Sequence, residues 1–109
     1  MVEGTLTVNP GQPVVFTFTV TNTTDQPVSL RFQDACKADF VARVEDTERW
    51  RWSEGQMFAQ ILEEVSLAPN EQTTFEAAWD DPDPGSYTAH AELTANNTTC
   101  EAETTFSVE

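Results

Sequence analysis

Hydrophobic and polar residues alternate with a period of two along most of the chain. The clearest run, residues 14–21, places large apolar side chains on one face of a strand and mostly threonines on the other. The same alternation recurs in five further segments: residues 28–33, 39–44, 75–79, 87–93 and 104–108. Because successive side chains of a strand point to opposite faces, each segment predicts a strand with one buried and one solvated face.

Clusters of Asn, Asp, Pro and Gly separate these segments and predict turns. The clusters are residues 9–12, 22–27, 68–71, 80–85 and 95–98. Short strands divided by turns at this spacing are typical of a sandwich or barrel and not of βαβ units. We therefore expect one all-β domain over residues 1–109, an immunoglobulin-like antiparallel β-sandwich of about seven to nine strands.

Residues 46–61 interrupt the alternation and are rich in aromatic side chains. Trp50 and Trp52 stand at alternate positions, so an extended backbone places both indoles on one side and Arg51 on the other. In one interpretation the indoles close one end of the core. In the other, the loop of residues 48–60 contacts a partner, since Trp and Arg dominate interface hot spots. Residues 58–62 could form a helical turn, but they are too few for a stable helix.

The charge balance is strongly acidic, with nineteen acidic residues against five basic ones and a formal net charge of −14. The acidic residues are spread along the whole chain. Their mutual repulsion is largely screened in molar salt, where the Debye length is about 3 Å. We interpret the composition as that of a halophilic archaeon, with a site for a basic partner or for cations as the alternative. Without a basic patch to release counterions, nucleic acid is excluded as a partner.

The sequence also argues against a membrane-bound protein. No stretch approaches the ~18 consecutive apolar residues of a membrane span, and residues 1–4 carry neither the basic nor the apolar region of a secretion signal. We therefore expect a cytoplasmic monomer that does not bind membranes.

Candidate catalytic and metal-binding groups are sparse. His90 is the only histidine and falls on the polar face of its strand, where a solvated imidazole is expected. No serine or cysteine stands in a triad-like arrangement with it, so we do not expect an enzyme. Asp80, Asp81 and Asp83 are interpreted as an ordinary acidic turn and not as a calcium site. No Cys/His cluster has zinc spacing either, so no metal ion or cofactor is expected.

The two cysteines, Cys36 and Cys100, are expected to be free thiols. The predicted turns place them at opposite ends of the sandwich, beyond the ~7 Å Cα separation that a disulfide allows, and a cytoplasmic address favours reduced thiols. The Asn-x-Thr patterns at residues 22–24 and 96–99 coincide with turns. We interpret them as turn chemistry and not as glycosylation sites.

The order of several short motifs resembles the BsuPI-type intracellular proteinase inhibitors over about residues 5–108. The most specific motifs are Trp50-Arg51-Trp52-Ser53 followed by Phe58, and Phe75 and Trp79 followed by Gly85-Ser86-Tyr87. The resemblance implies an immunoglobulin-like sandwich and inhibition of an intracellular serine proteinase. The chain departs from the family pattern at residues 34–38, which lack an expected glycine, and after Phe58, where a helix of any length is missing.

Residues and resemblance together predict a protein-binding function, namely inhibition of a subtilisin-like serine proteinase through surface loops. The candidate partner-binding residues lie in the 48–60 loop: Arg49, Trp50, Arg51, Trp52, Met57 and Phe58. Four of them could enter a specificity pocket, and the sequence does not choose among Arg49, Arg51, Met57 and Phe58. The alternative is a non-inhibitory immunoglobulin-like structural or protein-interaction module.

Overall fold

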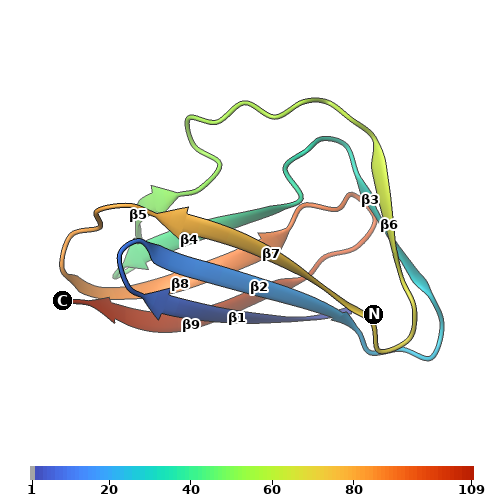
Figure 1. Cartoon of the computed structure of the whole chain (residues 1–109), viewed down its shortest axis with the longest axis horizontal. Coiled ribbons are helices and arrows are strands. Elements are labelled where there is room, and N and C mark those ends of the chain that lie inside the picture. Colours follow the sequence, from blue (N-terminus) through green and yellow to red (C-terminus); the bar gives the residue numbers. More distant parts are fainter. Residues whose placement is uncertain (1) are drawn as a thin grey trace.

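The computed structural model describes residues 2–109, which fold into antiparallel strands without a helix (Figure 1). The strands are β1 (Val2–Pro10), β2 (Val14–Asn22), β3 (Val28–Phe32), β4 (Ala38–Val44), β5 (Thr47–Arg51), β6 (Glu63–Leu67), β7 (Gln72–Trp79), β8 (Gly85–Leu93) and β9 (Glu101–Val108). They form a three-stranded sheet, β1-β2-β7, a four-stranded sheet, β5-β4-β8-β9, and a two-stranded ribbon, β3-β6. The prediction of an all-β sandwich with seven to nine strands is confirmed. No helix within residues 2–109 could cross a lipid bilayer.

Strand β2 is the centre of the three-stranded sheet and supplies much of the core. Its burial alternates along its whole length, as the sequence pattern predicts. Phe16 and Phe18 are fully buried, and both rings contact Phe40 of β4 in the opposite sheet. Ala89 and Ala91 of β8 are fully buried in the same cluster. Large side chains from β2 and small ones from β8 thus fill the space between the sheets, as close packing requires.

A closed ring of aromatic contacts joins the two larger sheets. Trp50 of β5 stacks between Phe16 and Trp79, with centroid separations of 5.1 and 5.2 Å. Tyr87 and Phe106 complete the ring, with separations of 5.2 Å from Trp79 to Tyr87, 5.3 Å from Tyr87 to Phe106 and 5.6 Å from Phe106 to Phe16. Each residue comes from a different strand. Trp50 therefore packs on the core, in keeping with the structural interpretation of the indoles.

Strand β1 closes one side of the sandwich, because it pairs with β2 and also lies against β9 (Figure 1). The close approach depends on Gly4. A Cβ at this position would lie 2.7 Å from the ring of Phe18 and 2.9 Å from Sγ of Cys100. Contacts this short are essentially never seen in folded proteins, so any side chain here would force Phe18, Cys100 or the strand itself to shift.

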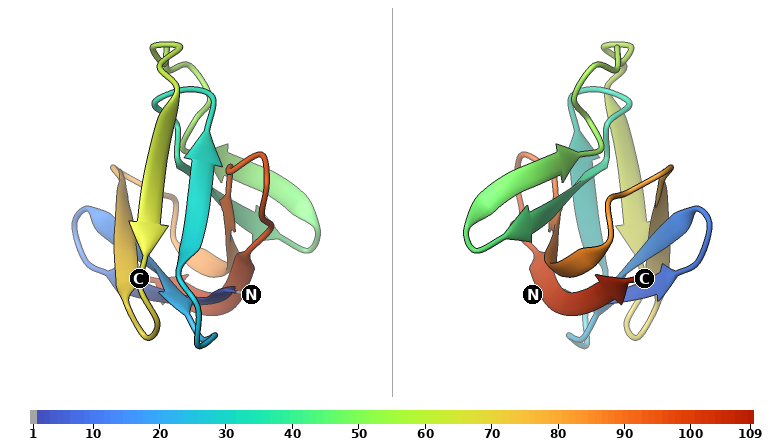
Figure 2. Two further views of the ribbon diagram at one scale, coloured as in Figure 1. Left: turned by 90° about the vertical axis from the view of Figure 1, so that its right-hand side faces the viewer. Right: turned by 90° about the vertical axis from the view of Figure 1, so that its left-hand side faces the viewer.

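The segment expected to be irregular begins with a strand. Thr47–Arg51 forms β5, which pairs with β4 across a register shift between Ala42 and Arg43. Asp46 lies in the turn before β5, and residues 52–62, hereafter the β5–β6 loop, lack strand structure. Residues 56–62 form no helical turn. The β5–β6 loop runs along the upper rim of Figure 1 and stands beyond the sheets in both views of Figure 2.

Cys36 and Cys100 are free, as expected, but they do not lie at opposite ends of the molecule. The hydroxyl of Thr94 donates a hydrogen bond to the carbonyl of Cys36. The amide of the preceding residue, Leu93, donates to the carbonyl of Cys100 at 2.8 Å. The predicted placement was wrong because the chain after β3 turns back toward the end of β8. Sγ of Cys36 faces the carbonyl of Ala38 at 3.5 Å, and it is not bonded to the second thiol.

Candidate functional site

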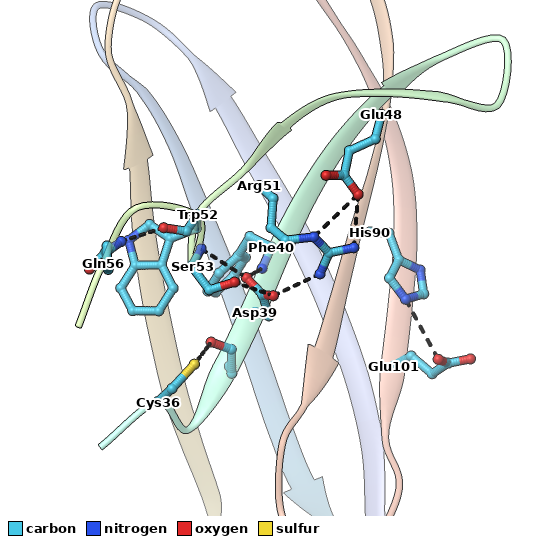
Figure 3. Close-up of polar contacts among 11 residues, drawn as sticks. Cys36, Asp39, Phe40, Glu48, Arg51, Trp52, Ser53, Gln56, His90 and Glu101 are labelled. Carbon is cyan, nitrogen blue, oxygen red and sulfur yellow. Dashed lines mark hydrogen bonds and ion pairs between the residues drawn. The ribbon is translucent and has the colours of Figure 1, made fainter. Parts of the chain in front are cut away.

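A polar network surrounds the carboxylate of Asp39 near the start of β4 (Figure 3). Asp39 is only 7% exposed. Its Oδ1 accepts hydrogen bonds from the backbone amides of Phe40 and Ser53, at 2.9 and 3.1 Å. Its Oδ2 accepts from the hydroxyl of Ser53 at 2.7 Å and from Nη1 of Arg51 at 2.8 Å. A buried carboxylate with four donors is held in one position, and here it fixes where the chain leaves β5.

Arg51 extends this network toward solvent. Its guanidinium also donates to Oε1 of Glu48, at 2.8 Å from Nη2 and 3.2 Å from Nε. The hydrogen bonds to Glu48 and then to Asp39 raise the pKa of Arg51 above its already high ordinary value. The side chain of Arg51 is therefore a charged structural element held by two carboxylates.

A second anchor of the β5–β6 loop, beside the Asp39 network, is formed by Trp52 and Phe58. The amide of Trp52 donates to the carbonyl of Phe40 at 2.9 Å, and its indole packs edge-on against the Phe40 ring at 6.1 Å. The ring of Phe58 lies 5.6 Å from the indole of Trp52. One residue further on, the carbonyl of Ala59 accepts a hydrogen bond from the amide of Ala35 at 2.9 Å. The loop is thus fixed both at its start and in its middle.

Large apolar side chains of the same loop are exposed. Met57 is 99% exposed, Leu62 is 84% exposed and Ile61 is 55% exposed. Arg49 of β5 is also exposed, and it is the basic residue of the described range 2–109 without a carboxylate in ion-pair contact. The predicted contact residues therefore fall into two groups. Arg49 and Met57 face solvent, whereas the other members are partly covered and packed or bonded within the fold: Trp50, Arg51, Trp52 and Phe58.

Two parts of this arrangement were missed by sequence reasoning. The anchoring role of Asp39 and Ser53 was not predicted, and neither was the exposure of Ile61 and Leu62. The one available signal for Asp39 is an acidic residue inside the otherwise apolar start of a strand, residues 38–42. Irregular backbone gives no periodicity from which exposure can be predicted.

His90 lies on the outer face of β8, as expected, but its side chain is only 21% exposed. Its Nε2 lies 3.5 Å from Glu101 and its Nδ1 lies 3.6 Å from Glu103. Nδ1 is buried and has no hydrogen-bond partner. Glu92 and Glu101 stand directly opposite each other in the β8–β9 ladder. One carboxylate oxygen of each and one imidazole nitrogen of His90, atoms that could ligate a metal ion, lie within 4.8 Å of one another. Like charges at such a cross-strand pair repel each other.

The acidic turn after β7 is organised by its backbone. The hydroxyl of Tyr87 donates to the carbonyl of Asp83 at 2.5 Å, and Asp81 adopts a left-handed φ of 53°. Within residues 2–109, none of the carboxylates of Asp80, Asp81 and Asp83 belongs to a group of possible metal ligands.

Two of the three asparagines at the Asn-x-Thr patterns hold turns, as the sequence predicts. Asn22 is fully buried, and its amide donates to the carbonyls of Gln26 and Leu67 at 2.7 and 3.0 Å. The side chain of Asn97 accepts from the amide of Arg31 at 3.0 Å and donates to a second backbone group of β3 at 2.9 Å. Asn97 therefore ties the β8–β9 loop to β3.

The thiols are poorly suited to nucleophilic chemistry. Burial, and after it the nearby carboxylates of Asp39 and Asp34, together raise the pKa of Cys36 to about 11. Burial also raises the pKa of Cys100. Because the thiolate is the reactive form, both groups are weak nucleophiles at neutral pH.

A family model supplies the identity that the geometry leaves open. The model of BsuPI, described as an intracellular proteinase inhibitor, matches residues 2–98. The match includes β1 to β8 and the entire β5–β6 loop. No curated protein sequence matches the chain. Since the family model covers most of the chain, the resemblance of the sequence motifs is confirmed, and the chain belongs to the BsuPI intracellular proteinase inhibitor family.

Proposed function

We propose that this protein inhibits a subtilisin-like serine proteinase by placing the β5–β6 loop in the active-site cleft. One observation carries the proposal: the loop is anchored by Asp39 and by Trp52, yet it presents Met57 fully to solvent. The description of the family as intracellular proteinase inhibitors supports a proteinase as the partner.

Anchoring is what an inhibitory loop needs physically. A loop that is already ordered loses little conformational entropy on binding, so more of the contact energy appears as affinity. Proteinase–inhibitor complexes accordingly form with little backbone movement. The inhibition proposed here is steric: the loop occupies the cleft and excludes substrate, and no bond is made or broken.

A second candidate function is a non-inhibitory interaction module. The packing of Trp50, Trp52 and Phe58 against the fold favours it, because these aromatics are then structural and are not available to a partner. Under this alternative the exposed part of the β5–β6 loop has no role in a proteinase cleft.

An inhibition titration separates the two candidates. Subtilisin-type serine proteinases are assayed in high salt with increasing amounts of the chain. Competition for the cleft raises the apparent KM and leaves kcat unchanged. A variant in which residues 54–61 are replaced by a Gly-Ser linker should lose inhibition. The matched control replaces Asp80, Asp81 and Asp83 by asparagine and should inhibit like the wild type. Equal inhibition by the linker variant, or no inhibition by the folded wild type, would contradict the proposal.

A further inference from the structure

The candidate residues differ in what their side chains already do within the fold. Arg51 is bonded to Asp39 and Glu48, and the ring of Phe58 rests on the indole of Trp52. To enter a pocket of another protein, each would first have to leave its partners, at the cost of those contacts. Trp50 stacks between Phe16 and Trp79, so it would lose two ring contacts on leaving the fold.

Met57 has no such partners, and its neighbours on both sides do. The side-chain amide of Gln56 donates to the carbonyl of Trp52, and the backbone amide of Gln56 donates to the carbonyl of Ser53 at 3.2 Å. On the other side, the ring of Phe58 packs on Trp52. Met57 is therefore a single projecting side chain between two fixed residues.

From this geometry we infer that Met57 fills the primary specificity pocket of the target proteinase, so that the target prefers long, unbranched apolar side chains at that position. This inference rests on the proposed inhibitory function and adds the specificity residue to it. Primary pockets of serine proteinases range from apolar slots to acidic ones, and the pocket sets which side chain is accepted. A flexible thioether chain fits an apolar slot well, and its burial there removes the whole exposed surface of Met57 from water.

The other exposed side chains are less suited to this role. Arg49 lies in β5, whose backbone is paired with β4, so it does not project from a loop. Leu62 directly precedes β6 and borders a surface hollow together with Phe32 and Asn96. It therefore lies at the base of the loop beside the β3-β6 ribbon.

Substitutions at Met57 test the inference without disturbing the fold, because the side chain contributes no buried surface. For a proteinase that the wild type inhibits, Met57→Asp should raise Ki at least about 100-fold, because an unpaired charge would enter an apolar pocket. Met57→Leu should stay within about threefold of the wild type, since the volume and polarity are similar. Met57→Lys should lose this target and gain inhibition of a proteinase with an acidic primary pocket.

Arg49→Ala and Leu62→Ala test the rival exposed side chains, and each should raise Ki far less than Met57→Asp does. Unfolding midpoints of all variants should equal that of the wild type. If the wild type inhibits but Met57→Asp inhibits equally well, the assignment of Met57 is overturned while the proposed function stands. A large loss in Arg49→Ala or Leu62→Ala with none in Met57→Asp would overturn it in favour of that side chain. If the folded wild type inhibits no proteinase, the proposed function fails and this inference falls with it.

Discussion

The carboxylate of Asp39 lies almost wholly out of solvent, and each of its oxygens accepts two hydrogen bonds. Two of these four bonds come from Ser53, the second residue of the β5–β6 loop. Removing one partner of a buried charged network leaves the remaining groups without hydrogen bonds, which costs more than the bond itself contributed. At the scale of single residues, Asp39 of β4 is therefore the polar residue on which the anchoring of the β5–β6 loop depends most.

Asp39→Asn should destabilise the protein by about 2–3 kcal/mol, because the new amide group presents donors where Ser53 and Arg51 also donate. The free energy of unfolding is measured by urea denaturation. Glu48→Gln is the matched control, since Glu48 binds the same arginine at an exposed site. Its effect should be at most about 0.5 kcal/mol. Equal losses in the two variants would show that burial of the Asp39 network contributes nothing.

The sequence predicted that the two indoles share one side of the chain, and both pack against the core. It did not predict which of two adjacent apolar residues, Met57 or Phe58, would be exposed. Trp50 and Trp52 stand two apart, so the period of an extended chain decides their direction. Met57 and Phe58 are adjacent in irregular backbone, where no period applies. Met57 is exposed and Phe58 is partly covered because the Phe58 ring contacts Trp52, and these two residues meet only in the folded chain.

At the scale of elements, strands with a strong apolar face were predictable and weakly patterned strands were not. β2 and β8 alternate clearly and were placed to within one or two residues. β4 was placed as closely, but Asp39 and Val41 on its other face are also buried, so the expectation of one solvated face was wrong for residues 38–42. β5 carries mostly charged residues beside its one tryptophan, and β6 has only two apolar residues. These two strands are formed by pairing with β4 and β3, so tertiary context decides them and local pattern does not.

Phe58→Ala tests whether the β5–β6 loop is held as an element. Without the ring on Trp52, the backbone of residues 54–61 should open more often, because its middle anchor is removed. Amide hydrogen exchange in this segment should accelerate at least about tenfold, while exchange in β2 and β8 stays slow.

Met57→Ala is the control for that measurement, since its side chain makes no packing contribution. It should leave exchange in the loop unchanged. Identical exchange in the two variants would mean that the Phe58–Trp52 contact does not order the loop.

At the scale of the whole molecule, charge is the dominant feature. Four basic residues are tied to carboxylates: Arg31 to Glu64, Lys37 to Glu63, Arg43 to Glu103, and Arg51 to Asp39 and Glu48. With a formal net charge of −14, most carboxylates have no cationic partner to offset them. Their repulsion opposes the compact state and weakens as salt shortens the Debye length.

The free energy of unfolding should therefore rise by on the order of 1 kcal/mol or more between 0.1 M and about 2 M NaCl, as the Debye length falls from about 10 Å to less than 3 Å. Denaturation with urea, which carries no charge, measures the change. NaCl is preferable to sulfate here because sulfate also strengthens apolar burial. Equal midpoints at the two salt concentrations would contradict the interpretation of the acidic surface as an adaptation to salt.

The proposed inhibitor places its β5–β6 loop in the active-site cleft of a serine proteinase. The most direct test uses a subtilisin-type proteinase that the chain inhibits. Binding of the chain to the free enzyme is compared with binding to the same enzyme after a peptidyl chloromethyl ketone has covalently filled the cleft. Both are measured by calorimetry in high salt. We predict tight one-to-one binding to the free enzyme and none to the blocked enzyme. Equal binding to both would place the contact surface outside the cleft and contradict the claim.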